Sequence, residues 1–377
     1  MGWLVVKLQP VYLKAMVLGN AAVKNRNADV RGRSFWLAPL LAVGSVACLA
    51  QTPVFTRYPI PTSGSFLDGI VAGPDGNVWF TEFQGNKIGR ITTAGVVTEF
   101  SVPTANSGPA SITTGPDQNL WFGEALGHKI GRISTNGVIT EFPLNSPYAG
   151  PGWITSGPDG NLWFIAGGAA IGRITPAGVI TFLGGPPSPF PPAITSGPDG
   201  NLWFTTLANS IGRITTSAVL LPEFPIPTPG SQPEGIAAGS DGNVWFTEIQ
   251  GNKIGRITTT GIITEFSVPT PMALPWVIVS RPDGTLWFTE NPGKIGKITS
   301  AGLITEFTVP FYSVPYRIAL GPDGNIWFTD YYADQIVKMI LPSISPTPVP
   351  SSLIMLCTGL AALIIWQGWR ARFIGAA

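Results

Sequence analysis

Seven tryptophans recur along the chain at nearly constant spacing. They are separated by 42, 42, 40, 42, 42 and 40 residues, and they are Trp79, Trp121, Trp163, Trp203, Trp245, Trp287 and Trp327. Self-similarity at a fixed period of 20–50 residues is the mark of a repeat architecture, and a period near 42 with one Trp in each unit is typical of propeller blades. The repeat therefore predicts seven blades in place of several unrelated domains.

Each repeat divides into four short strands. In the first unit, strands are predicted at 77–81, 87–92 and 96–100, and each unit opens with a strand like 235–239 of the fifth. Runs of Val, Ile, Thr, Phe and Trp suit a half-buried pleated surface. The Asp-Gly pair before the tryptophan, as in Asp75-Gly76, is a strong signal for a hairpin turn. The pattern predicts an all-β protein.

The two ends of the array complement each other. The last unit stops after its third strand at 335–340, and a lone fourth-type strand at 54–59 precedes the first unit. Pairing of these two strands would close the ring and leave no sheet edge free. The sequence thus predicts a closed seven-bladed β-propeller of 28 strands over residues 51–342. We expect the tryptophans to pack between blades, and Arg90 and its equivalents to pair across a hairpin with Glu99 and its equivalents.

The terminal segments have a different character. Residues 1–50 hold a basic stretch and an apolar run at 34–50, typical of an export signal, and Met16 is an alternative start. A Pro/Ser linker at 343–352 leads to an apolar segment at 353–369, inside a C-terminal anchor region at 353–377 that ends in a basic tail. This order resembles the PEP-CTERM sorting signal of bacterial envelope proteins. We expect an exported protein at the bacterial cell envelope or outside it, held in the membrane through residues 353–369 or released by cleavage.

Charge and cysteine content narrow the function. Eight of the 22 basic residues but only one of the 21 acidic residues lie in the terminal segments, so the repeat region is acidic. An acidic surface argues against nucleic acid as a partner. Both cysteines, Cys48 and Cys357, are terminal, and the chain has one histidine, His128. Thiolate chemistry in the propeller is excluded, and we expect a monomer.

Two positions in each repeat should face the end of the central channel. One precedes the first strand: Asp68, Ala110, Gly152, Pro192, Glu234, Trp276 and Tyr316. The other follows the Trp-Phe pair: Glu82, Glu124, Ala166, Thr206, Glu248, Glu290 and Asp330. Five acids at one channel mouth predict a Mg²⁺ or Ca²⁺ site at Glu82, Glu124, Glu248, Glu290 and Asp330. The alternative is that these carboxylates are solvated or bonded to backbone amides.

The first position also predicts a ligand surface. Trp276 and Tyr316 belong to neighbouring repeats and could form an aromatic wall for a flat or sugar-like ligand. Asp68 and Glu234 add two carboxylates to the same end. The alternative interpretation of the two aromatic residues is packing at the rim.

The repeat wording resembles the virginiamycin B lyase (streptogramin lyase) family. The shared motifs are Gly-Pro-Asp-Gly-Asn-Leu-Trp-Phe-Thr-Glu and Asn-Lys-Ile-Gly-Arg-Ile-Thr. The resemblance spans residues 54–341. It implies a seven-bladed propeller and Mg²⁺-dependent elimination that opens a cyclic depsipeptide. It also implies two histidines, which map to Trp276 and Tyr316, and two glutamates, which map to Val314 and Asp330.

Only Asp330 keeps an acid at these four positions, so we expect a binding module rather than an enzyme. Its ligand at the envelope would be a glycan, a peptide or a protein. The alternative is a Mg²⁺-dependent carbon–oxygen lyase of the streptogramin B type, or a related metal-dependent hydrolase.

Overall fold

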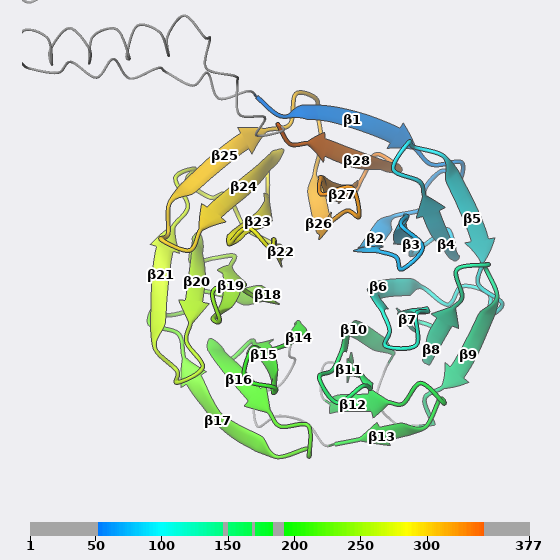
Figure 1. Ribbon diagram of the computed structural model, residues 1–377, viewed down its shortest axis with the longest axis horizontal. Coiled ribbons are helices and arrows are strands. Elements are labelled where there is room, and N and C mark those ends of the chain that lie inside the picture. The colour runs from blue at the N-terminus through cyan, green and yellow to red at the C-terminus, as the bar shows by residue number, and fades with distance from the viewer. Residues whose placement is uncertain (1–51, 146–149, 168–169, 184–191, 343–377) are drawn as a thin grey trace, which may run out of the picture. The chain divides into compact units, whose positions relative to one another are not determined.

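The computed structural model describes residues 52–145, 150–167, 170–183 and 192–342. These residues form 28 strands in seven four-stranded antiparallel sheets, arranged as blades around a central axis (Figure 1). No helix occurs in these ranges, so none of their residues belongs to a helix that could cross a membrane. The predicted fold class and strand number are confirmed. The predicted leader, linker and anchor lie outside the described residues.

We call the four strands of a blade A, B, C and D. Strand A lies nearest the axis, and B, C and D follow toward the outside, which is also their chain order in blades 1 to 6. Blade 1 is β2 (Leu67–Ala72), β3 (Val78–Glu82), β4 (Lys87–Ile91) and β5 (Val97–Ser101). Blade 2 is β6 (Pro109–Thr114), β7 (Leu120–Glu124), β8 (Lys129–Ile133) and β9 (Ile139–Pro143). Blade 3 is β10 (Pro151–Ser156), β11 (Leu162–Ala166), β12 (Ala170–Ile174) and β13 (Ile180–Phe182).

The remaining blades follow the same order. Blade 4 is β14 (Ile194–Ser196), β15 (Leu202–Thr206), β16 (Ser210–Ile214) and β17 (Leu220–Pro225). Blade 5 is β18 (Pro233–Ala238), β19 (Val244–Glu248), β20 (Lys253–Ile257) and β21 (Ile263–Ser267). Blade 6 is β22 (Ile278–Ser280), β23 (Thr285–Glu290), β24 (Lys294–Thr299) and β25 (Ile304–Thr308).

Blade 7 is assembled from both ends of the described chain. It contains β26 (Pro315–Leu320), β27 (Ile326–Asp330), β28 (Gln335–Ile340) and, as its outermost strand, β1 (Val54–Pro59). Val54 lies opposite Ile340 and Pro59 lies opposite Gln335. The predicted closure of the ring by the N-terminal strand is confirmed, and it removes the free edge that an open array would present.

The Gly-Pro-Asp-Gly-Asn motif forms the turn between strands A and B and also fixes the tryptophan. In blade 1, Asp75 Oδ1 accepts hydrogen bonds from the Trp79 indole at 3.0 Å and from the Asn77 backbone at 3.2 Å. Gly76 has a φ of 75°, a conformation that glycine adopts without strain. One short motif therefore sets both the turn and the orientation of the largest core side chain.

The core lies between the blades, as predicted for the tryptophans. Trp79 is fully buried, stacks on Phe100 at 5.6 Å between ring centres, and belongs to a cluster with Ile112 and Phe122 of blade 2. Full burial of one such ring stabilises the fold by about 4–6 kcal/mol at about 25 cal/mol per Å². The tryptophan of each repeat thus provides the contact between neighbouring blades.

The expected pairing of Arg90 with Glu99 is wrong. Glu99 lies opposite Gly89, and its carboxylate Oε2 forms an ion pair with Lys87 Nζ at 2.6 Å. The Arg90 guanidinium turns the other way, where it lies 5.6 Å from the Trp79 ring centre and donates a hydrogen bond to the Thr135 carbonyl of blade 2. Successive side chains of a strand point to opposite faces of the sheet. A difference of one residue in register therefore places Glu99 beside a different basic side chain.

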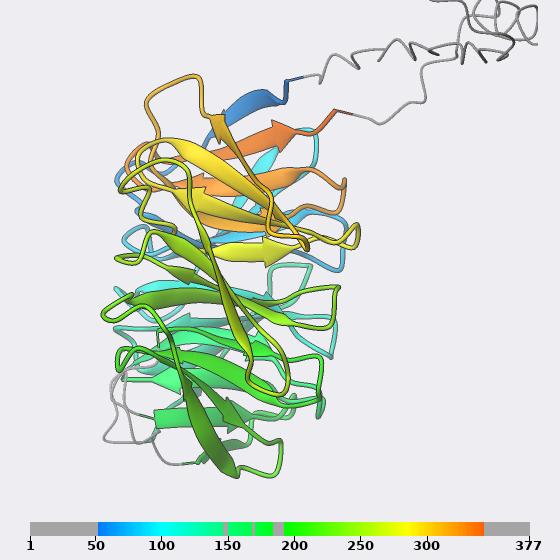
Figure 2. The same ribbon diagram turned by 90° about the vertical axis from the view of Figure 1, so that its left-hand side faces the viewer.

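The propeller has two distinct ends (Figure 2). We call the end with the B–C and D–A connections the loop end. In blade 1 these connections meet where the Phe83 amide donates to the Phe66 carbonyl at 3.1 Å. We call the opposite end, with the A–B and C–D turns, the turn end. β1 begins and β28 ends at the turn end.

Candidate functional site

Aromatic side chains form a continuous row at the loop end across blades 6, 7 and 1. Neighbouring ring centres are 5.6 Å apart for Trp276 and Tyr316, 4.8 Å for Tyr316 and Tyr331, and 4.8 Å for Tyr331 and Tyr332. Phe66 meets the edge of Tyr331 at 5.5 Å. We call these five residues the aromatic row. The structure thus brings together the two aromatic residues singled out in the sequence and adds three more.

The row ranges from buried to open. Burial raises the pKa of Tyr316 to about 12, so its phenol is neutral at physiological pH. Tyr332, at the other end, is 66% exposed. The Trp276 indole nitrogen is buried and has no hydrogen-bond partner among the described residues. The row therefore offers a ligand an apolar surface and a phenol that keeps its proton.

Arg317 lies beneath the row and links opposite sides of the ring. It extends from β26 of blade 7, where its Nε donates to Asp68 Oδ1 of blade 1 at 2.8 Å. Its guanidinium lies 4.4 Å from the ring centre of Trp153, which belongs to β10 of blade 3, and 5.0 Å from that of Tyr316. A cation over an aromatic face is attracted by the ring quadrupole, more strongly when water is excluded.

Trp153 crosses the channel from the other side. Its side chain packs against hydrophobic clusters of blades 4 and 5, and against one built mainly from blades 6 and 7. Together with Arg317 it lines a cavity of about 180 Å³ along the axis, with Ser111, Ile154 and Ile236 among the other walls. The two long side chains meet inside the channel and form a floor below the aromatic row.

The two predicted carboxylates of this end have different roles. Asp68 is bound to Arg317, as above. Burial raises the pKa of Glu234, and the nearby Arg317 charge opposes that rise. The other members of the set, Ala110, Gly152 and Pro192, carry little or no side-chain polarity. The charged residues of this position therefore gather around Arg317.

The acids that follow strand B do not lie open at the channel mouth. Glu82, Glu124, Glu248, Glu290 and Asp330 are at most 1% exposed. Glu82 accepts a 2.8 Å hydrogen bond from the Ser65 hydroxyl and lies beside the Lys87–Glu99 ion pair of its own blade. The other three glutamates are equally buried, and neither carboxylate oxygen of Glu124, Glu248 or Glu290 has a hydrogen-bond partner among the described residues.

Burial changes the protonation of these glutamates. It raises the pKa of Glu82 and Glu124 to about 7, and of Glu248 and Glu290 to about 8. The carboxylates of Glu265 and Glu306 add to the rise for the last two, because a second negative charge nearby disfavours ionisation. At neutral pH, Glu248 and Glu290 are therefore mostly protonated, and Glu82 and Glu124 are close to their midpoint.

The residues at the expected metal positions do not fit a divalent cation. Asp330 is the one acid among the four family positions, and its two oxygens accept hydrogen bonds from the Val314 amide at 3.1 Å and the Gln335 side chain at 3.0 Å. In the described part of the chain, no three His, Cys, Asp or Glu side chains are grouped so that they could hold a metal. Hard cations require several oxygen ligands, so the predicted Mg²⁺ or Ca²⁺ site has no preformed ligand set here.

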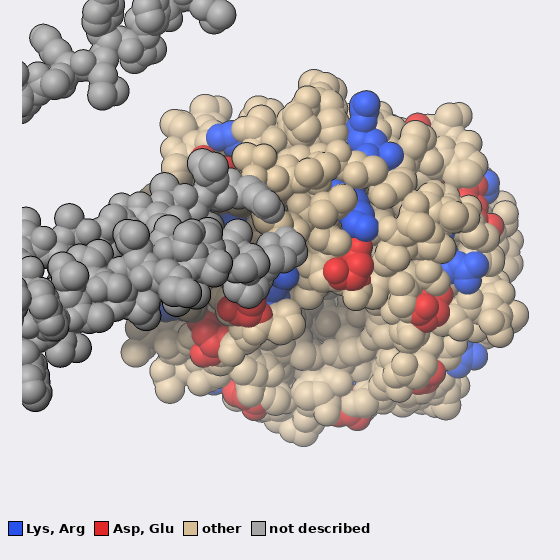
Figure 3. Space-filling view, turned by 45° about the horizontal axis from the view of Figure 1, so that its top comes forward, with Lys and Arg blue, Asp and Glu red and all other residues tan. Residues whose placement is uncertain are grey.

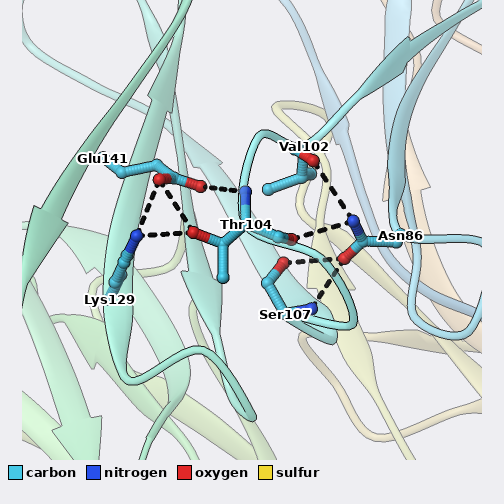
Figure 4. A network of polar contacts seen from close by, with 6 residues as sticks. All are labelled: Asn86, Val102, Thr104, Ser107, Lys129 and Glu141. Atoms are coloured by element: carbon cyan, nitrogen blue, oxygen red, sulfur yellow. Dashed lines mark hydrogen bonds and ion pairs between the residues drawn. The ribbon is translucent and has the colours of Figure 1, made fainter.

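Hydrogen bonds between neighbouring blades hold the loops of this end in place (Figure 4). The Asn86 amide donates to the Val102 and Thr104 carbonyls and accepts from Ser107. Thr104 in turn binds Glu141 of blade 2, which pairs with Lys129 at 2.8 Å. Blades 5 and 6 repeat the arrangement with Asn252, Thr270 and Glu306. The loop end is therefore a rigid frame for the aromatic row.

Sequence reasoning missed Arg317 and Trp153. Both are the third residue of their inner strands, β10 and β26, and the equivalent residues of the other blades are Gly69, Ser111, Ala193, Gly235 and Val277. In blade 5 the backbone leaves no space for a side chain, since a Cβ on Gly235 would lie 2.6 Å from the Trp276 carbonyl oxygen. The sequence signal was the presence of two large residues at a repeat position where most blades carry a small one.

The chain is similar to known proteins along its whole propeller. The model of the Virginiamycin B lyase family matches residues 28–188 and 171–339. A streptogramin B lyase structure is 39% identical with a TM-score of 0.73, and the match covers 77% of this chain and 98% of that one.

Two structures of virginiamycin B lyase from Staphylococcus aureus are each 40% identical with a TM-score of 0.72. They cover 77% of this chain and 100% of theirs. One contains selenomethionine, and the other is a catalytically inactive histidine-to-alanine variant with quinupristin. On the extent of the family match and on this identity, the chain belongs to the virginiamycin B lyase family.

Proposed function

We propose that this propeller is a binding module of the cell envelope that holds a carbonyl-rich, ring-bearing ligand on its aromatic row and does not cleave it. The observation that carries the proposal is the contact of Trp276 with Tyr316, whose ring centres are 5.6 Å apart. These residues stand where the family resemblance places two histidines. Cyclic depsipeptides are the ligand class that the family relation suggests.

The side chains at these positions are poorly suited to proton abstraction. A general base works best when its pKa lies near the working pH. Tyr316 has a pKa of about 12 and an indole is not basic, while Val314 has no ionisable group. Asp330 has both oxygens in hydrogen bonds. The chain's own residues can orient and desolvate a ligand here, and none of them is poised to take its proton.

The same side chains are well suited to contact. Aromatic faces bury large apolar areas, and Tyr332 at the open end of the row is 66% exposed. The catalytically inactive virginiamycin B lyase variant is described with quinupristin. A propeller of this family that lacks activity can therefore still hold such a ligand.

The second candidate function is carbon–oxygen elimination of the streptogramin B lyase type. The identity of 39–40% to proteins named as lyases favours it, as does the acid retained at Asp330. The two candidates differ in whether the bound ring is opened, so one experiment separates them.

The test uses the purified full chain and quinupristin. Calorimetry should give saturable binding to the unmodified chain and at least about tenfold weaker binding to Trp276→Ala, as expected when an aromatic anchor of a site is removed. The matched control is Leu207→Ala, because Leu207 is 51% exposed in the B–C loop of blade 4, away from the row. This control should bind like the unmodified chain.

Product analysis completes the test. Chromatography with mass spectrometry, with Mg²⁺ and separately with EDTA, should show intact quinupristin in both samples. A ring-opened isomer of unchanged mass that forms only with Mg²⁺ would establish the lyase. Absence of binding, or equal binding by Trp276→Ala, would overturn the assignment of this ligand class to the aromatic row.

A further inference from the structure

The turn end carries a complete ring of exposed aliphatic side chains. In every blade, the residue immediately before the regular part of strand D, or the first residue of β1 in blade 7, is Val, Ile or Leu. These residues are 54–68% exposed: Val54, Val96, Val138, Val179, Val219, Ile262 and Leu303. In blade 7, Val54 lies opposite Ile340. In blade 1, Val96 comes just before Val97, which lies opposite Ile91. Val54 and Val96 therefore stand at the same end of strand D in their blades. We call these seven residues the aliphatic ring.

The ring differs from ordinary scattered exposure. Single apolar residues on a surface are normal, whereas contiguous or organised ones mark interaction sites. At the loop end, Met272 and Tyr312 are exposed at equivalent positions of blades 6 and 7, but blades 1, 2 and 5 carry Gly64, Asn106 and Gly230 there, so no apolar ring forms. At the turn end, all seven blades present the same type of side chain at the same level. A flat surface can therefore touch all of them at once.

Charge at the same end is confined to partly covered side chains: Arg90, which donates to the Thr135 carbonyl of a C–D turn, is 28% exposed. The six C–D turns, residues 92–96, 134–138, 175–179, 215–219, 258–262 and 299–303, contain no Asp, Glu, Lys or Arg. The A–B turn aspartates bond within their own blades: the Asp75 side chain is 16% exposed and binds Trp79 and Arg90, and Asp283, at 49%, is the most exposed among those in ion pairs. Figure 3 shows charged side chains as small separate groups with uncharged surface between them.

The path of the chain indicates what this end meets. β28 ends at Ile340 at the turn end, and residues 343–352 separate it from the apolar segment at 353–369. Ten residues span at most about 35 Å when fully extended. An anchor formed by the apolar segment would therefore keep the turn end close to the bilayer surface.

From the ring, the uncharged turns and the point of exit, we infer that the turn end lies on a lipid surface, with the aliphatic ring in the interfacial region. Apolar side chains gain free energy on entering the boundary between headgroups and acyl chains, and seven coplanar contacts add to the tether. In this orientation the loop end, with the aromatic row, faces away from the membrane. The inference does not depend on what the aromatic row binds.

The experiment compares two label positions at opposite ends of blade 2. The full chain carries Cys48→Ser and Cys357→Ser, and either Val138→Cys in the ring or Leu126→Cys at the loop end. The native side chains are 67% and 60% exposed, so the two sites start from similar accessibility. Each chain is labelled with a fluorophore and mixed with vesicles of phosphatidylcholine and phosphatidylglycerol that contain a nitroxide lipid. We expect quenching to be several-fold stronger at 138.

A second variant tests whether the aliphatic side chains make the contact. Val96→Thr, Val179→Thr and Val219→Thr are added to the Val138→Cys chain, because Thr keeps the shape and strand preference of Val but is polar. Quenching at 138 should fall toward the value at 126, with the melting temperature unchanged. A chain that does not float with the vesicles, equal quenching at 138 and 126, or full quenching in the Thr variant would each overturn the inference.

Discussion

Arg317 of blade 7 and Trp153 of blade 3 meet across the central channel, with the guanidinium carbon 4.4 Å from the indole ring centre. The same guanidinium binds Asp68 of blade 1 at 2.8 Å. One side chain therefore joins three blades that are far apart in the sequence. It also lies beneath the aromatic row and lines the axial cavity together with Trp153, so a ligand at the loop end would lie above this contact.

Removal of the Arg317 charge should destabilise the propeller. Arg317→Leu leaves Asp68 without its partner in a largely buried place, and loss of one member of a buried pair costs about 3–5 kcal/mol. Urea denaturation of the full chain should show this loss. Arg317→Lys keeps the charge but loses the planar stacking on Trp153, so an intermediate loss is expected. A change below about 0.5 kcal/mol for Arg317→Leu, the usual range for surface substitutions, would contradict this role.

Protein stability should fall as the pH rises through neutrality. The pKa values of Glu248 and Glu290 are raised from 4.5 in the unfolded chain to about 8 in the fold, so the folded state binds more protons between these values. Their contribution to stability is complete below about pH 4.5 and is lost as the pH rises through about 8. Melting temperatures measured from pH 5 to pH 9 should show this decline, with Glu82 and Glu124 adding to it near pH 7.

The matched variant for the pH effect is Glu248→Gln with Glu290→Gln. Glutamine resembles a protonated glutamate in shape and cannot ionise. The double variant should therefore lose less stability between pH 5 and pH 8 than the unmodified chain. An identical pH profile for the two proteins would show that other groups cause the decline.

The interblade hydrogen bonds of Asn86 should be measurable separately from its backbone conformation. Asn86 has a φ of 53°, which costs most residues roughly 1–2 kcal/mol but costs glycine little. Asn86→Gly removes the side-chain hydrogen bonds alone, and Asn86→Ala also adds backbone strain. In urea denaturation, Asn86→Ala should be the less stable variant by about 1 kcal/mol. Equal stability of the two variants would mean that the left-handed backbone carries no cost here.

Gly131 should tolerate no side chain. A Cβ at this position would lie 2.1 Å from Phe122 Cζ, and the Phe122 ring is fully buried with no room to move. Gly131→Ala should therefore express as aggregated or unfolded protein. Gly76→Ala is the control, because its Cβ meets nothing within 4 Å and only its φ of 75° is unfavourable, at a cost of about 1–2 kcal/mol. A soluble Gly131→Ala chain with an unchanged melting temperature would refute the steric argument.

Most of the fold could be predicted because its determinants are local and repeated. The Asp75-Gly76 turn, the alternation around Trp79 and the unpaired strand at 54–59 are all readable within a few residues. The site was less accessible to such reasoning. The contact of Arg317 with Trp153 joins residues of blades 7 and 3 that lie far apart in the sequence, and no local pattern reports it. The repeat pattern likewise predicted Glu82 at the channel end, but not the loop at Ser65 that buries it.

The pairing of β1 with β28 also sets the order in which the chain can become complete. Val54 is among the first propeller residues to be made, and its partner Ile340 is almost the last. Until then β1 has no strand to join, and blade 7 cannot form. Contacts between such distant residues are slow to form, and an unpaired strand is open to wrong partners in the meantime. In a chain synthesised from its N-terminus, β1 therefore remains unpaired until nearly the whole ring has been made.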